Sequence, residues 1–196
     1  MRTRWFFSTA AILILAAGIV RPSLARDGKR PVIRRLPVEK NEPLAITDVK
    51  VDGRSVSLNE EFFASENWIR TLAISVKNIS DKPILYSSVG MVFPRPPNSE
   101  DSPLRYSVGH GNDELMIRQR REFEQLDEMM PGSIVEITFS DSDFSDLRQR
   151  LKEMGYPSVV ENVSLRIGHV IFEDDTMWST GFVPHRSPNT PGLWVR

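Results

Sequence analysis

Apolar and polar residues alternate with a period of two along most of the chain after residue 40. Such alternation places successive side chains on opposite faces of a β-strand, so it predicts strands with one buried face. The segments that show it are 44–51, 68–77, 84–93, 134–139 and 159–172, with shorter candidates at 32–38, 54–58 and 104–108. The pattern predicts a mostly β chain, which we expect to fold as an antiparallel β-sandwich of about seven to nine strands.

Helical spacing of apolar residues is clearest between residues 142 and 154. The apolar residues there recur at intervals of three and four: Phe144, Leu147, Leu151 and Met154. A run of Asp and Ser precedes them and Gly155 follows, which are typical signals for the start and end of a helix. We predict a crossover α-helix over about 142–154. A possible second helix covers about 113–129, where oppositely charged side chains lie four residues apart.

Turn-forming residues separate several of the predicted strands. Asp52-Gly53 lies between 44–51 and 54–58 and supplies the positive φ angles of a two-residue hairpin turn. The segment 94–103 is rich in proline, which cannot donate a ladder of hydrogen bonds, and it is predicted to be a loop.

Three consecutive acidic residues, Glu173, Asp174 and Asp175, follow the longest alternating segment. We expect Asp174-Asp175 to form a two-residue turn, which pairs Ile171 with Trp178 and keeps Trp178 on the buried face. The alternative is a calcium site that combines the three carboxylates with oxygens of a neighbouring loop. Three consecutive acids cannot by themselves supply the roughly six to eight ligands that calcium takes, so the turn is favoured.

The histidines offer a second candidate metal site. His110, Asp113 and Glu114 form the most metal-like cluster, but their spacing matches no zinc motif and a turn is favoured. His169 has the parity of the buried face and is predicted to be a hydrogen-bonded core residue.

The tryptophans could in principle form a platform on which sugars stack. Trp68 and Trp178 have strand parity that points inward, so we predict that both belong to the core. Trp194, in the proline-containing tail 187–196, is the candidate exposed aromatic for binding a ligand, or else it holds the tail against the sandwich.

The first 25 residues have the pattern of an export signal. Arg2 and Arg4 precede an apolar run of 11 residues, and small residues lead to a cleavage position after Ala25. The run is shorter than the roughly 20 residues that cross a membrane, which disfavours the alternative of an uncleaved anchor. We therefore expect a periplasmic or secreted protein with no membrane span once the signal is removed.

Composition narrows the class of protein further. Removal of residues 1–25 takes away three of the 25 basic residues and leaves 22 against 26 acidic ones, a formal charge of −4. An acidic chain argues against nucleic acid as a partner. The sequence contains no cysteine, which is ordinary for a periplasmic bacterial domain. We expect an extended lead-in over 26–41 and one sandwich domain over 42–186.

Motifs for known catalytic chemistry are missing from the sequence. It contains no nucleophile elbow, no His-Glu-x-x-His pair, no phosphate-binding glycine loop and no paired-cysteine metal motif. No catalytic residue and no cofactor is therefore predicted, and a catalytic role is less favoured than a binding role.

Two sequence segments carry a resemblance. "LAISVKNISDKPI" (72–84) and "MMPGSIVEI" (129–137) resemble the strands of bacterial immunoglobulin-like sandwich domains. Together with "VKVDGRSVS" and "FEDDTMW", they are similar to exported bacterial proteins of uncharacterised function. The resemblance implies an immunoglobulin-like β-sandwich and a glycine where this chain has Asp175, and it implies no catalytic residue.

The leading functional hypothesis is an exported, non-catalytic module that binds an unknown protein or glycan through the loops 94–103 and 110–130. One alternative is an envelope hydrolase, metal-assisted or glycan-directed, with His110, Asp113 and Glu114 as its candidate residues. Another alternative is a structural subunit of an envelope assembly.

Overall fold

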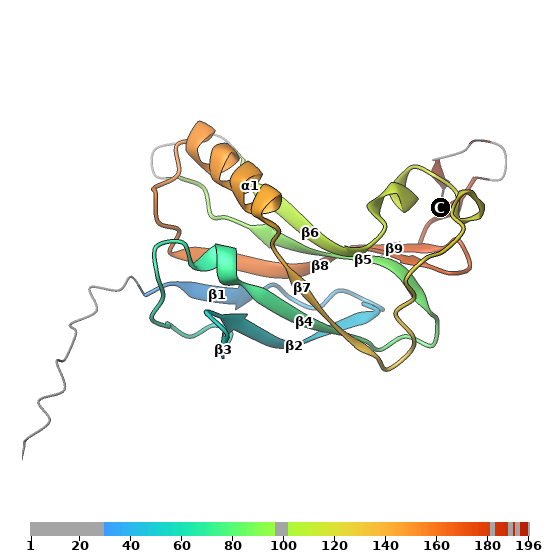
Figure 1. Cartoon of the computed structure of the whole chain (residues 1–196), viewed down its shortest axis with the longest axis horizontal. Helices are drawn as coiled ribbons and strands as arrows, with labels where there is room; N and C mark the ends of the chain where they lie inside the picture. Colours follow the sequence, from blue (N-terminus) through green and yellow to red (C-terminus); the bar gives the residue numbers. More distant parts are fainter. Residues whose placement is uncertain (1–29, 97–101, 181–182, 188–189, 191–192, 196) are drawn as a thin grey trace, which may run out of the picture.

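The computed structural model describes residues 30–96, 102–180, 183–187, 190 and 193–195, and in this part the chain is mostly β (Figure 1). Sheet A has the strand order β1 (Val32–Arg35), β8 (Asn162–Phe172), β5 (Ile84–Val92) and β6 (Arg105–Gly111), and β9 (Met177–Ser179) also pairs with β8. Sheet B has the order β3 (Arg54–Ser55), β2 (Leu44–Val51), β4 (Ala73–Asn78) and β7 (Ile134–Thr138). Strands β10 (His185–Arg186) and β11 (Trp194–Val195) pair with each other. The mostly β, sandwich-like fold is confirmed, while the predicted signal peptide lies outside the described residues.

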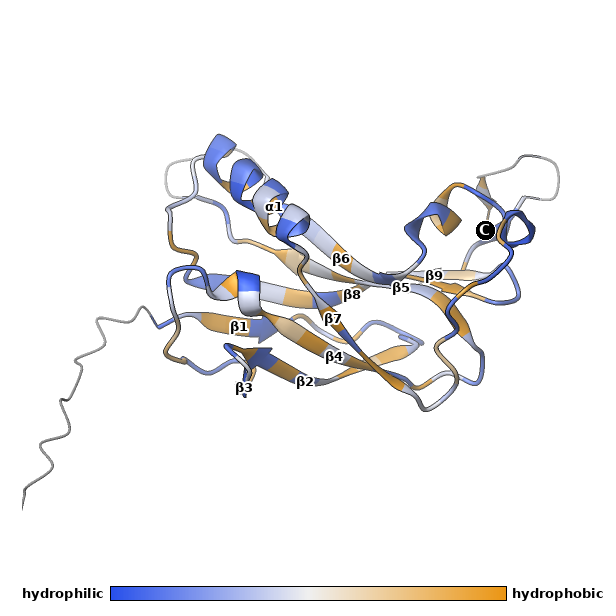
Figure 2. Cartoon of the chain, in the orientation of Figure 1, coloured by the Kyte–Doolittle hydropathy of each residue, from blue (hydrophilic) through white to orange (hydrophobic). Residues whose placement is uncertain are grey.

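The inner faces of sheets A and B enclose the main core. Alternate residues of each strand contribute to it, as the apolar strand positions in Figure 2 illustrate. Trp68 and Trp178 are both fully buried, and each indole N–H donates to a backbone oxygen, that of Val160 at 2.9 Å and that of Lys40 at 3.2 Å. Buried indoles need such partners, so both residues are core residues as predicted.

The β2–β3 hairpin turns at Asp52-Gly53, as predicted. Both residues have positive φ, 51° at Asp52 and 72° at Gly53, which is the backbone that this two-residue turn requires.

Helix α1 (Asp141–Glu153) confirms the predicted crossover helix, since it leaves β7 and leads toward β8. Ser140 caps it by accepting a hydrogen bond from the amide of Asp143, and the carboxylate of Asp143 accepts one from the amide of Ser140. Leu147 and Leu151 are buried against the main core.

Two predicted elements have different boundaries or types in the structure. The strand predicted from residue 68 begins at Ala73, because Trp68–Thr71 forms the 3₁₀ helix η1. The Thr71 hydroxyl accepts a hydrogen bond from the amide of Asp52 and bonds its carboxylate, so this turn packs against the β2–β3 hairpin.

The prediction of a second helix over 113–129 is wrong. The segment contains the short 3₁₀ helices η2 (Asp113–Met116) and η3 (Arg120–Glu122), separated by extended backbone at Gln119. Of the charge pairs at four-residue spacing, Glu114–Arg118 forms, whereas Arg120 pairs with Glu128 and not with Glu124. Each such pair is worth only a few tenths of a kcal/mol, too little to hold a long helix against other packing.

A β-bulge interrupts β8 opposite Ser88 and changes which side chains face the core. Val89 pairs with Ile167 and Ser87 with Val170, so Gly168 and His169 together stand opposite the single residue Ser88. The bulge shifts the alternation of β8 by one, and His169 is exposed instead of buried. The prediction that His169 is a core residue is therefore wrong.

The turn after β8 is also one residue longer than predicted. The amide of Phe172 donates to the oxygen of Thr176, which leaves Glu173, Asp174 and Asp175 as a three-residue loop with Asp175 at a φ of 58°. Trp178 consequently pairs with Val170, not with Ile171. Trp178 remains buried because the bulge has already turned Val170 toward the core.

Candidate anion-binding face

The outer face of sheet A is divided into two unlike halves. At one end, Leu85, Leu115, Ile171 and Met177 form a second buried apolar cluster outside the main core. Val170 and Phe172, the strand neighbours of Ile171, belong to the main core, so Ile171 points to the opposite, outer face. Leu85 and the adjacent Tyr86 pack on that same side, where β5 shifts register. The segment 113–126 covers them, with Phe123 and Leu126 packed against the cluster. We call this end the covered half.

The other half of the same face has no such cover among the described residues. Its outward side chains, identified by strand pairing, are those of Arg34, Asn162, Ser164, Arg166, Ser88, Gly90, Val92, Arg105, Ser107 and Gly109. We call this set the arginine face. Figure 1 shows where it lies, on β1, β8, β5 and β6, away from the segment that covers the other end. The set contains three arginines and no carboxylate. At the edge of β1, Val32 and the Glu61 that it pairs with face the same way, and Glu61 forms an ion pair with Arg30.

The arginines of this face are not neutralised by acids. Many other described arginines form ion pairs with a carboxylate: Arg30, Arg35, Arg70, Arg118, Arg120, Arg150 and Arg186. Among the described residues, Arg34, Arg105 and Arg166 form none, and Arg34 donates instead to the neutral amide oxygen of Asn162 at 3.0 Å. The face therefore carries a net positive charge on a chain that is acidic once residues 1–25 are excluded.

Glycine and serine residues keep much of this face free of bulky side chains. A Cβ atom at Gly90 would lie 3.4 Å from the Cγ of Arg166, so the aliphatic part of Arg166 crosses the sheet above Gly90. At Gly109 a Cβ atom would lie 2.8 Å from the ring of Tyr86, which packs on the bare backbone there. Small residues therefore let the long side chains of Arg166 and Tyr86 lie flat against the sheet.

Tyr86 marks the boundary between the two halves. Burial, followed by the nearby charge of Asp113, raises the pKa of its phenol above the ordinary value. The phenol stays neutral at physiological pH, and it adds no negative charge to the arginine face.

His169 lies at the bulge, on the exposed side of sheet A. Its backbone amide donates to the Ser88 hydroxyl at 2.9 Å, which fixes the bulge. Partial burial, and then the positive charge of Arg166, lower the pKa of the imidazole below its usual value. His169 is therefore mostly neutral near pH 7.

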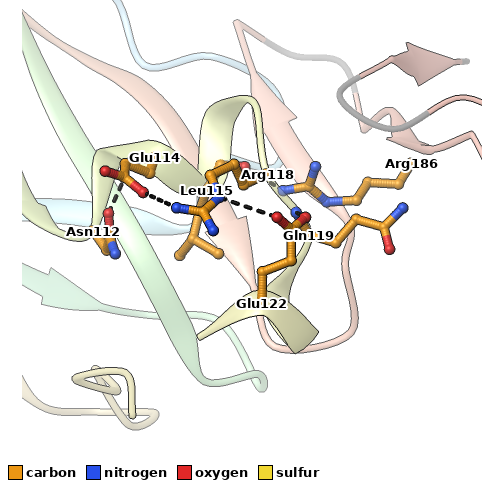
Figure 3. Close-up of polar contacts among 7 residues, drawn as sticks. All are labelled: Asn112, Glu114, Leu115, Arg118, Gln119, Glu122 and Arg186. Atoms are coloured by element: carbon orange, nitrogen blue, oxygen red, sulfur yellow. Dashed lines mark hydrogen bonds and ion pairs between the residues drawn. The ribbon is translucent and has the colours of Figure 1, made fainter. Parts of the chain in front are cut away.

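The predicted cluster of His110, Asp113 and Glu114 does not converge in the structure. His110 pairs with Ser87 in the sheet and points to the inner side, where its Nε2 atom lies 3.7 Å from Asp127. Glu114 instead forms an ion pair with Arg118 at 2.7 Å. Figure 3 shows Arg118 between Glu114 and Glu122, a contact that ties η2 to η3.

The three consecutive acids also separate. Asp174 forms an ion pair with Lys82 at 2.6 Å; partial burial opposes its ionisation, but hydrogen bonds from Lys82 and Thr176 lower its pKa overall. Asp175 lies 3.3 Å from the Nε atom of Arg186. Across the described residues, no group of three or more His, Cys, Asp or Glu side chains is placed to hold a metal ion. A calcium site at Glu173, Asp174 and Asp175 therefore stays a prediction, for which these contacts add no further ligands.

Trp194 is half-buried and helps to attach the C-terminal segment to the covered half. Its indole N–H donates to the oxygen of Met116 at 3.0 Å, and the guanidinium of Arg186 lies 4.4 Å from the centre of its ring. Arg186 also donates to the backbone oxygen of Leu115, toward which it points in Figure 3. These contacts agree with the sequence-based alternative that Trp194 holds the tail against the sandwich.

Sequence reasoning missed the arginine face. Arg34, Arg105 and Arg166 stand far apart in the chain; Arg34 belongs to the basic pair Arg34-Arg35, and the other two have no basic neighbour. One pattern in the sequence does point to this face: Asn162, Ser164 and Arg166 alternate with buried aliphatic residues, so all three lie on the outer side of the same strand. Strand order, which brings β1, β8, β5 and β6 together, is not encoded in that alternation.

Comparison of the chain with models of protein families, with curated proteins and with solved structures gave no match. Among the described residues, no helix has both the length and the hydropathy needed to cross a membrane.

Proposed function

We propose that this chain is an exported, non-catalytic binding module that holds an anionic ligand on the arginine face of an immunoglobulin-like sandwich. Export is supported by the pattern of residues 1–25, which places the mature protein in the periplasm or outside the cell. A binding role is supported by the absence of catalytic motifs from the sequence.

The observation that carries the proposal is the group of Arg34, Arg105 and Arg166 on one sheet face without a carboxylate. Guanidinium groups present a planar set of donors that matches carboxylate, sulfate and phosphate oxygens. Acids elsewhere in the chain pair with other cations, so these three charges are left for a partner outside the chain.

Retention on a sulfonated cation-exchange resin tests this proposal directly. A protein of residues 26–196 has a formal charge of −4 and would pass through such a resin at pH 7 if its charges were evenly spread. We expect retention at low salt, because the arginine face binds the sulfonates locally.

A matched pair of variants identifies the surface responsible. Arg105→Gln with Arg166→Gln removes two charges from the arginine face, whereas Arg54→Gln with Lys77→Gln removes two from sheet B. The first variant should flow through and the second should be retained. Equal elution of the two variants would refute the proposal.

A further inference from the structure

We infer that the ligand of the arginine face is an extended acidic polysaccharide that lies across the strands of sheet A; this inference rests on the proposed function and specifies its ligand. Three properties of the face lead to it: the spacing of the charges, the groups between them, and the kinds of side chain that are absent from the described surface there.

The strand positions that carry the three arginines are spread across the face. Arg34 and Arg105 stand in one row that runs Arg34, Ser164, Val92, Arg105 across four strands. Three strand spacings of about 4.8 Å separate the ends of the row by roughly 14 Å. Arg34 is held at its own end by Asn162, and Arg166 lies one row further along, above Gly90. An extended ligand with several anionic groups can meet each arginine at its own place on the face.

The groups between the arginines suit a carbohydrate. Ser164 is partly exposed and Ser107 fully exposed, and both hydroxyls can donate to or accept from sugar hydroxyls. The β5 strand between them contributes Gly90 and Ser88, which are buried and add no bulk above the sheet; Arg166 lies over Gly90. A polymer with a carboxylate or sulfate on successive sugars would meet Arg34 on β1, Arg166 on β8 and Arg105 on β6 in turn.

The other polyanions fit this surface less well. Peripheral membrane binding combines basic residues with exposed apolar side chains, and none of the large exposed apolar residues of the described chain stands at an outward position of this face. Single-stranded nucleic acid is bound on exposed aromatic rings, whereas the ring nearest the face, that of Tyr86, packs on Gly109.

The test compares four probes with a protein of residues 26–196: a polymer of uronic acid, its monomer, vesicles of phosphatidylglycerol, and single-stranded DNA. Affinity is measured by isothermal titration for the soluble probes and by co-sedimentation for the vesicles. We expect the polymer to bind, the affinity to fall as salt rises, and the monomer to bind at least about a hundred-fold more weakly.

The variant Arg34→Gln/Arg105→Gln/Arg166→Gln should weaken polymer binding by about ten-fold or more, and Arg54→Gln/Lys77→Gln should leave it unchanged. Urea denaturation of each variant verifies that the fold is retained. Equal affinity for monomer and polymer would overturn the inference, as would binding of the vesicles or DNA in preference to the polymer.

Failure of the inference can be distinguished from failure of the proposed function. If the resin retains the protein through Arg105 and Arg166 but no uronic acid polymer binds, the ligand class is wrong and the anion-binding face stands. If the resin also fails to distinguish the two matched variants, both conclusions fall.

Discussion

The two halves of the outer face of sheet A are built from the same strands, yet one is covered and the other is open. At the covered half, β5 and β8 present Leu85 and Ile171, and the segment 113–126 closes over them. At the arginine face, the same strands present Gly90 and Arg166 and no described segment packs above them. The bulge at Gly168 and His169 lies between the two. The difference shows that burial on this face is decided locally, by which side chains the strand alternation turns outward.

The cover should depend most strongly on Leu115, its fully buried residue. We expect Leu115→Ala to reduce the free energy of unfolding by about 2–5 kcal/mol, because it leaves a cavity above Leu85 and Ile171. Ile117→Ala provides the control, since Ile117 is 69% exposed and its loss should change stability by no more than about 0.5 kcal/mol. Urea denaturation of both variants measures the difference. Equal effects would mean that the covered half is not a packed cluster.

A substitution at Gly168 tests the boundary between the two halves. A Cβ atom there would lie 2.4 Å from the Ser88 hydroxyl oxygen, so Gly168→Ala should cost about 1–3 kcal/mol through overpacking. Ser88→Gly removes the obstructing oxygen together with its two hydrogen bonds to the backbone of His169. The double variant should therefore be more stable than the sum of the single effects predicts, as measured by a denaturation cycle. Strict additivity would show that the two residues do not meet at the bulge.

Arg186, which donates to the backbone oxygen of Leu115 in the covering segment, forms an ion pair with Asp175. The Arg186 side chain is only 7% exposed, so loss of its partner leaves a buried positive charge with poorer compensation. Because Asp175 is itself 47% exposed, we expect Asp175→Asn to cost only about 1 kcal/mol. Asparagine also tolerates the positive φ at this position, so the turn is preserved.

The control for that variant is Asp174→Asn, which breaks the more exposed pair with Lys82. It should cost less than Asp175→Asn in the same thermal or urea measurement. The reverse order would indicate that Arg186 does not depend on Asp175 for its charge compensation.

The smallest expected effect is a pH dependence at His169. Because its pKa is lowered in the folded state, the stability that it contributes is present above the unfolded pKa of about 6.5 and is lost as the pH falls below it. His169→Gln should reduce the difference between the urea midpoints at pH 7.5 and pH 5.5. His185→Gln, which replaces an exposed histidine on β10, should leave that difference as in the parent protein.

Much of the fold could be predicted from period-two alternation. The strand positions, the Asp52-Gly53 turn and the helix at 141–153 follow from local patterns that the structure preserves. The bulge could not be predicted, because Gly168 and His169 continue the alternation and the cause of the bulge is Ser88, 80 or so residues earlier in the chain. This non-local contact accounts for the error at His169. The β8–β9 register differs because the turn at 173–175 has three residues and not two.

The candidate surface could be predicted less well than the fold. Sequence reasoning looked for clustered acids and histidines, and the structure separates Asp174 from Asp175 and His110 from Glu114 by giving each a different partner. The arginine face forms only when β1, β8, β5 and β6 are neighbours. Their outward residues come from four distant parts of the chain, so no local spacing reveals them.

Strand β1 pairs in parallel with β8, joining Val32 to Asn162 across a sequence separation of 130 residues. In a chain synthesised from its N-terminus, β1 can bond the nearby residues 59–62 early, but its pairing with β8 must wait until most of the protein has been made. Contacts this distant close slowly, since the entropy of a long loop is lost before any bond is gained. Ile33, which is fully buried in the finished molecule, is consequently among the last side chains to be sheltered, and the first strand in sequence becomes a late one in folding.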